Sequence, residues 1–163
     1  MSIFDKVFKA HEDAKAAKVA EERRRAAAAF EKRKDFILTF RSEAARVAKP
    51  IFEQFAADAR RNGFTARVVD KLSVVKEPTL SVRFHPTRNV QMTKELEEEE
   101  SVFELRCLAD DLKVEHVSMF DQRPKRSGVK HDKLGMPSIN ALVLEEHLAE
   151  FLCDSLKARE PED

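Results

Sequence analysis

Residues 103–120, FELRCLADDLKVEHVSMF, decide the fold class of this 163-residue chain. Apolar residues alternate with charged ones over 103–107, and a second alternation runs from Leu112 to Phe120. This period of two is typical of half-buried β-strands. Only residues 109–111 separate the two runs, which is short enough for a hairpin. We therefore expect two antiparallel neighbouring strands.

The same alternation occurs twice earlier in the chain. Residues 64–69 alternate in one segment, and residues 80–84 alternate in another that Pro86 should end. All the expected strands thus lie within 64–120. The sequence predicts a mostly antiparallel sheet of about four strands.

The region before this sheet has a helical composition. Residues 1–63 contain only Pro50 and Gly63 as breakers and are rich in Ala, Glu, Lys and Arg. Pro50 should interrupt the helix near Lys49, because proline lacks a backbone donor and crowds the preceding turn. Gly63 should end a second helix, expected over 50–62, by adopting a left-handed cap.

The region after the sheet divides into a loop and a helix. Residues 121–136 are polar and are interpreted as a loop, and a final helix is expected over 138–158 with an apolar face that can cover the sheet. The predicted fold class is α+β: a long N-terminal helical segment, the sheet, and a C-terminal helix packed on it. The predicted organisation is a helical arm over 1–49 and an α+β domain over 50–163.

The N-terminal helical segment is the part that suggests assembly. Residues 11–29 carry no large apolar side chain, and a helix continuous to Lys49 would be about 70 Å long. Protrusion or dimerisation is therefore plausible. From residue 30 onward an apolar stripe begins, which could face a partner or could instead pack on the chain's own sheet. The expected partner-binding residues are Arg23, Arg24, Arg25, Phe30, Ile37 and Phe40.

Two basic clusters are candidate anion sites. The arginines at 23–25 belong to residues 1–63, which hold fifteen basic and ten acidic residues. They could contact nucleic-acid phosphates, or they could form a solvated face, since Glu21, Glu22 and Glu31 are interleaved. The second cluster could bind phosphate or an acidic partner, or could be an ordinary exposed loop; it consists of Arg123, Lys125, Arg126, Lys130 and Lys133.

The chain carries no signature of catalysis, of a cofactor or of a metal. Its five histidines lack zinc-site spacing, and the acidic run 97–100 lacks the alternation and the glycine of a calcium loop. Cys107 and His116 could approach each other in the predicted hairpin as a nucleophile and its base, but a cysteine in an apolar strand is usually inert. We assign no catalytic, cofactor-binding or metal-ligating residue, and we lean away from an enzyme.

Composition limits the remaining choices. The thirty basic and thirty acidic residues balance, which implies no uniformly charged partner. There is no long apolar run or signal peptide, and the two cysteines fit free thiols without a disulfide. We therefore expect a cytoplasmic protein with no membrane partner. The leading hypothesis is a non-enzymatic protein-protein interaction or assembly module that forms a homo-oligomer through its N-terminal helices; the alternative is a nucleic-acid-binding protein using the basic arm and the 121–136 loop.

Overall fold

A computed structural model of the chain describes residues 2–126 and 128–160. It divides the chain into two compact units, Met1–Asp35 and Phe36–Asp163. The boundary predicted from the sequence, after residue 49, lies further along the chain. The difference arises because the helical residues Phe40, Ala44 and Ala48 are fully buried in the core of the second unit.

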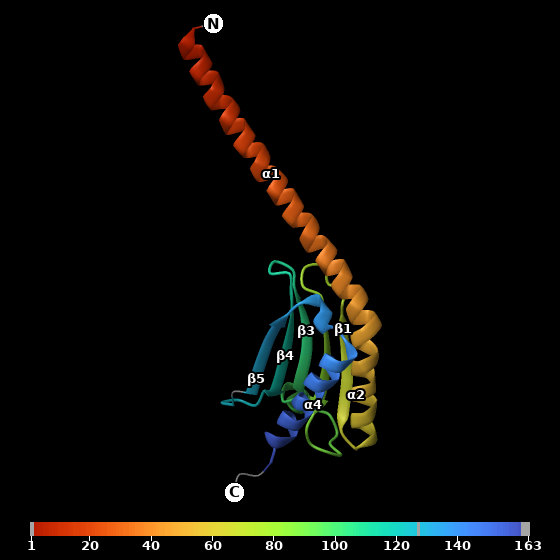
Figure 1. The fold of residues 1–163 in the computed structure, drawn as a ribbon. Helices are drawn as coiled ribbons and strands as arrows, with labels where there is room; N and C mark the ends of the chain where they lie inside the picture. The colour runs from red at the N-terminus through yellow and green to blue at the C-terminus, as the bar shows by residue number, and fades with distance from the viewer. Residues whose placement is uncertain (1, 127, 161–163) are drawn as a thin grey trace. The chain divides into compact units, whose positions relative to one another are not determined.

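The first unit is a single helix, as its composition predicts. Helix α1 (Ile3–Glu43) begins at Ile3 and continues past the end of this unit (Figure 1). Ser2 caps it, because its hydroxyl accepts the Asp5 N–H at 3.1 Å while the Asp5 carboxylate accepts the Ser2 N–H at 3.2 Å. From Ser2 to Asp35 no side chain is buried.

The helical part of the second unit contains the interruption expected before Pro50. Instead of a break, one wide turn, η1 (Ala44–Ala48), precedes helix α2 (Lys49–Arg61), and the Lys49 N–H donates to the Ala44 carbonyl. Such a turn is a common response where the regular ladder is disturbed. Gly63, with φ of +87°, ends α2 as predicted, and the Phe64 N–H closes the cap on the Ala59 carbonyl at 3.0 Å.

An antiparallel sheet follows, with its strands in sequence order, so each strand pairs with the next along the chain (Figure 1). The predicted hairpin is present and pairs Leu105 with His116. The strands are β1 (Thr65–Lys71), β2 (Thr79–His85), β3 (Ser101–Leu108), β4 (Lys113–Asp121) and β5 (Gly128–Leu134).

Within residues 2–126 and 128–160 the sheet has five strands, so the expectation of about four is corrected. Strand β5 lies in the segment 121–136 that the sequence assigned to a loop. Strand β5 lies at the edge of the sheet, next to β4, and an edge strand can be polar on both faces. Its sequence, GVKHDKL, therefore lacks the alternation of apolar and polar residues that identifies the other strands. It begins at Gly128, where a Cβ would lie only 2.6 Å from the Cβ of Asp121.

Two α-helices follow β2 in the described part of the chain, one before β3 and one after β5. Helix α4 (Ala141–Lys157) is the expected C-terminal helix; η2 (Met136–Ser138) precedes it, and the Asn140 side chain caps it by accepting the Val143 N–H at 3.0 Å. Helix α3 (Lys94–Glu98) is a short helix that contains the start of the acidic run 97–100.

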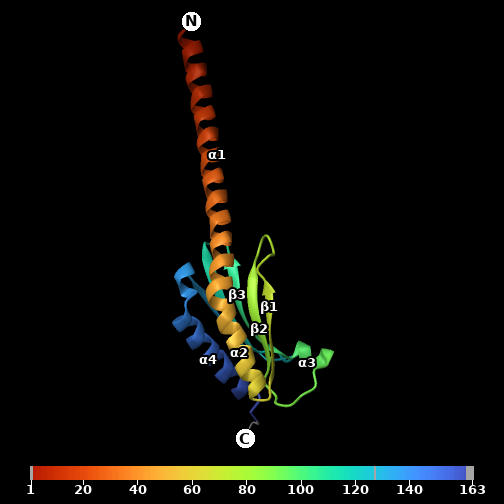
Figure 2. The same ribbon diagram turned by 90° about the vertical axis from the view of Figure 1, so that its right-hand side faces the viewer.

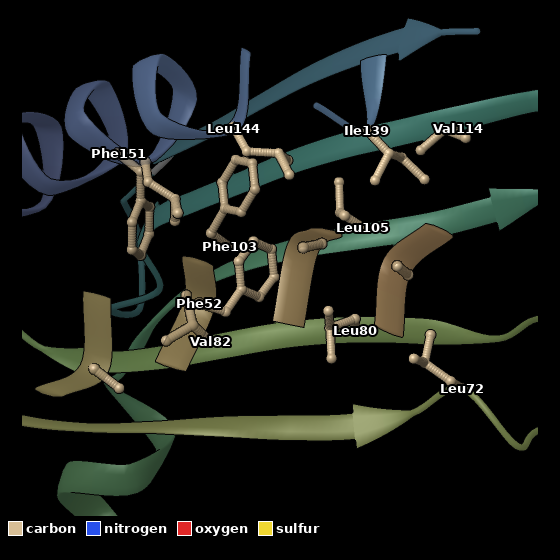
Figure 3. Packing of buried hydrophobic residues seen from close by; sticks show 14 of the residues in the cluster. Phe52, Leu72, Leu80, Val82, Phe103, Leu105, Val114, Ile139, Leu144 and Phe151 are labelled. Atoms are coloured by element: carbon tan, nitrogen blue, oxygen red, sulfur yellow. The ribbon is translucent and has the colours of Figure 1, made fainter. Parts of the chain in front are cut away.

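The core lies between the sheet and the helices α2 and α4, which both contribute to one buried cluster (Figures 2 and 3). Phe103 stands at its centre: its ring centroid is 5.8 Å from that of Phe52 on α2 and 5.9 Å from that of Phe151 on α4. The chain has no Tyr or Trp, and these three phenylalanines are buried.

Candidate functional site

The first unit exposes a cluster of large apolar side chains near its start. Ile3, Phe4, Val7 and Phe8 are 63–72% exposed. Residues one turn apart on a helix are neighbours, so 3 and 7, and 4 and 8, form one apolar surface. We call these four residues the N-terminal apolar patch.

The arginine run lies further along the same unit. Arg24 and Arg25 both pair with Glu21, the latter at 3.3 Å, and both remain largely exposed. Neighbouring carboxylates therefore neutralise part of the positive charge that a phosphate backbone would need. The ion pairs agree with the interleaving of glutamates and arginines noted in the sequence.

The apolar residues expected to bind a partner divide into two groups. Phe30 is 57% exposed and remains available. Phe40 is fully buried, and Ile37 packs against the same core of the second unit. Phe40 therefore cannot contact a partner from the surface, and this part of the stripe packs on the chain's own core.

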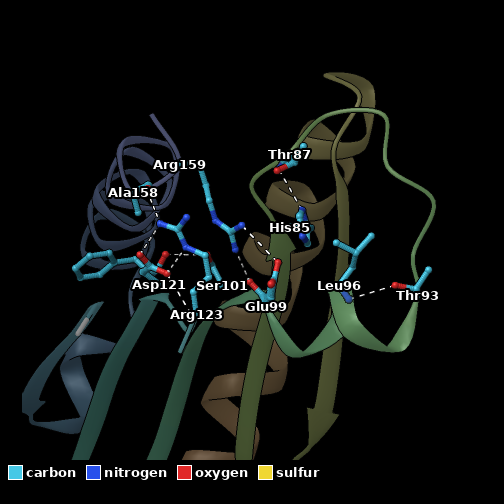
Figure 4. A network of polar contacts seen from close by, with 11 residues as sticks. His85, Thr87, Thr93, Leu96, Glu99, Ser101, Asp121, Arg123, Ala158 and Arg159 are labelled. Atoms are coloured by element: carbon cyan, nitrogen blue, oxygen red, sulfur yellow. Dashed lines mark hydrogen bonds and ion pairs between the residues drawn. The ribbon is translucent and has the colours of Figure 1, made fainter. Parts of the chain in front are cut away.

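The predicted basic loop does not form one cluster. Lys130 and Lys133 are an odd number of residues apart in β5, so they point to opposite faces: Lys130 contacts α4, whereas the Lys133 Nζ lies 3.9 Å from the Asp111 carboxylate. Arg123 binds Asp121 at 2.9 Å and the Ala158 carbonyl at 2.6 Å (Figure 4). Lys125 and Arg126 are exposed basic side chains of the 121–126 segment.

The proposed pairing of Cys107 with His116 does not occur as a strand pair, because Cys107 lies opposite Val114. Burial raises the pKa of the Cys107 thiol to about 11, so the thiol stays protonated. Cys107 behaves as a small apolar core residue.

His116 instead faces a histidine of α4. Its Nδ1 lies 3.0 Å from the Nδ1 of His147, and the two rings meet edge to face with centroids 4.8 Å apart. Burial, with a smaller effect from the nearby His147, lowers the pKa of His116 to about 4, so this ring is neutral at pH 7.

A chain of hydrogen bonds assigns the tautomers of the pair. The Ser138 hydroxyl donates to the Gly135 carbonyl at 2.7 Å, so its oxygen accepts from the Nε2–H of His116 at 2.8 Å. The Nδ1 of His116 is then an acceptor, and His147 must donate its Nδ1–H to it. In its neutral form, His147 therefore carries its free lone pair on Nε2.

The two histidines line a cleft of about 340 Å³ between α4 and the strands β4 and β5. Register explains the strand contributions, because His116 pairs with Asp132, and Ser118 pairs with Lys130. The cleft is lined by Phe103, His116, Ser118, Lys130, His131, Asp132, His147, Glu150 and Phe151.

Sequence reasoning missed His147 and Asp132 as members of a site. His147 does carry a signal, because it shares one face of α4 with the buried Leu144, Leu148 and Phe151, where an apolar residue would be expected. Asp132 carries none, because its position depends on β5, which was not predicted.

Comparison with known proteins gives no relative from which a function could be carried over. No protein-family model, no curated protein and no solved structure matches the chain. Within residues 2–126 and 128–160, no three His, Cys, Asp or Glu side chains gather in a way that could hold a metal ion. No helix in the described part of the chain combines the length and the apolar character needed to cross a membrane.

Proposed function

We propose that this protein is a non-enzymatic interaction or assembly module that self-associates through the helix of its first unit. The observation that carries the proposal is the N-terminal apolar patch, whose four large side chains are all more than three-fifths exposed. Burying one such side chain stabilises a complex by about 1.5–3 kcal/mol, and a helix laid against a second helix buries a whole apolar face.

The alanine content between the patch and Phe30 supports the same function. Residues 26–29 are four consecutive alanines, and others occur at 10, 14, 16, 17 and 20. Small side chains allow the axes of two helices to approach closely. The second copy of the chain is therefore a suitable partner, and the outcome is a homo-oligomer.

The alternative, nucleic-acid binding, has weaker support. Glu21 pairs with Arg24 and Arg25, so part of the positive charge of the basic run is neutralised on its own helix. The segment 121–136 adds no compact basic cluster, since Lys130 is held by Glu150 and Asp154. A protein that bound phosphates through these residues would lose affinity steeply with salt.

Light scattering on a sizing column tests the proposal. Because the chain has no Trp or Tyr, its concentration must come from refractive index, and absorption at 260 nm would reveal bound nucleic acid. We expect a dimer or larger species at both low and high salt, converted to monomer by the double substitution Phe4→Asp and Phe8→Asp.

The matched control is Leu142→Asp, which changes an exposed apolar residue of α4 in the second unit. It should leave the oligomer intact. A monomeric wild-type chain, or an oligomer unchanged by the two Asp substitutions, would refute assembly through the patch. A nucleic-acid signal lost in high salt would support the alternative.

A further inference from the structure

The cleft between α4 and the strands β4 and β5 presents several acceptors without protein donors. Among the described residues, the Nε2 of His147 and the carboxylate of Asp132 have no hydrogen-bond partner or ion pair. The Ser118 hydroxyl also lacks a partner, although this residue is 92% buried. Buried polar groups are normally paired, so an unpaired one beside a cavity indicates a missing partner.

The charges around the cleft favour a cation. Among the described residues that line the cleft, Lys130 is the only lysine or arginine. Its ammonium group already forms ion pairs with Glu150 at 2.9 Å and with Asp154 at 2.8 Å. Asp132 adds a further carboxylate, and His116 is neutral. The fixed charges at this end of the cleft therefore sum to a negative value.

The size of the cleft favours a small molecule. Its volume of about 340 Å³ is at the small end of ligand-binding sites, and Phe103 and Phe151 line it although their side chains are almost completely buried. Lys130 shows that the region can hold an ammonium group, because its Nζ also lies 5.6 Å from the centroid of the Phe120 ring.

We propose that this cleft is a binding site for a small organic cation, an ammonium or amidinium compound, whose N–H groups donate to the Nε2 of His147 and to the Asp132 carboxylate. The rest of the ligand lies in the cleft between α4 and β5. The Ser118 hydroxyl lies in the wall of this cleft without a partner.

His116 acts in this site as a positioning residue. Its Nε2–H is fixed by Ser138, so its Nδ1 always accepts from His147. The hydrogen bond holds the His147 ring and places the acceptor nitrogen Nε2 away from His116, in the cleft. In many functional sites, a hydrogen bond to one ring nitrogen of a histidine fixes which nitrogen carries the proton.

Nuclear magnetic resonance titration of the full chain tests the proposal. The probes are benzylammonium and benzamidinium, with benzoate and benzyl alcohol as anionic and neutral compounds of similar size. We expect saturable shifts of the His147 ring nitrogens with the two cations, at dissociation constants on the order of 1 mM, and none with benzoate.

Two substitutions locate the binding. Asp132→Asn and His147→Gln should each weaken the binding of benzylammonium by about tenfold or more, as loss of a hydrogen bond to a charged group does. Asp132 is exposed, so its substitution leaves the fold intact. The control Asp111→Asn removes an exposed carboxylate from the β3–β4 hairpin and should leave the affinity unchanged.

The ring nitrogens also test the positioning role directly. Without ligand, neutral His147 should carry its proton on Nδ1 and His116 on Nε2; Ser138→Ala should release this assignment and weaken binding several-fold. The proposal is overturned if benzoate binds as well as benzylammonium, if no probe gives saturable shifts, if Asp132→Asn leaves the affinity unchanged, or if zinc alone binds both histidines while the cations do not.

Discussion

Residues 3–35 and residues 36–61 are both helical, but only the second stretch buries side chains. In the second stretch Phe40, Ala48 and Phe52 recur at helical spacing and enter the core. In the first, apolar residues larger than alanine are confined to the N-terminal apolar patch, Val19 and Phe30, and all of them are exposed. Packing stabilises one stretch, whereas intrinsic propensity and surface charge pairs must stabilise the other.

This difference has a thermodynamic consequence. An isolated helix in water is only marginally stable, because each residue contributes little once nucleation has occurred. A helix of this kind gains most from a partner that covers its apolar residues. The comparison shows that the second stretch contributes to the core, and it supports our proposal that the first stretch is available for association.

The largest expected effect is on the packed stretch. Phe52→Ala should destabilise the second unit by about 3–5 kcal/mol, because a fully buried aromatic ring is replaced by a cavity. Phe30→Ala, on the exposed stretch, should change the free energy of unfolding of the second unit by less than about 0.5 kcal/mol. Urea denaturation followed by circular dichroism measures both, and similar losses from the two substitutions would refute the division of roles.

The next effect is a pH dependence confined to the second unit. The pKa of His116 is about 4 in the folded chain against an ordinary value of 6.5. Between these pH values the unfolded chain binds more protons, so stability is complete above pH 6.5 and falls as the pH drops toward 4. The total loss is about 3 kcal/mol.

Denaturation at several pH values measures this loss. His116→Gln should flatten the profile between pH 6.5 and 4, while His11→Gln, in the first unit, should leave it unchanged. An unaltered slope in His116→Gln would show that other groups cause the acid sensitivity.

The smallest effect concerns the charge pairs of the exposed stretch. Glu21→Gln removes the partner of Arg24 and Arg25, and exposed pairs at this spacing contribute about 0.2–0.5 kcal/mol each. Relative to the unsubstituted chain, the magnitude of the ellipticity at 222 nm should decrease slightly at low salt and much less at high salt. A large loss of helix would mean that the pairs, rather than propensity, maintain it.

The fold class could be predicted because its signals are local. The strand alternation of 103–107, the short hairpin loop and the Gly63 cap each depend on a few adjacent residues. Strand β5 could not be predicted, because it is held at the edge of the sheet by backbone pairing with β4. Its polar sequence shows no alternation of apolar and polar residues. The division after Asp35 was equally inaccessible, since burial of Phe40 depends on long-range contacts.

The histidine cleft was inaccessible to sequence reasoning because its members lie on separate elements. His116 and His147 are 31 residues apart and meet only when α4 packs on β4. Asp132 joins them through the register of β5. The sequence did identify the helical segment as the candidate for association, and that hypothesis stays a prediction.

Amide hydrogen exchange of the full chain at two protein concentrations tests the central claim most directly. Exchange reports local opening, so an unpartnered helix exchanges quickly and a packed one slowly. We predict that residues 3–35 become protected as concentration rises, while the core strands β2 and β3 are protected equally at both concentrations. Residues 3–35 with the same exchange rates at both concentrations would contradict association through this helix.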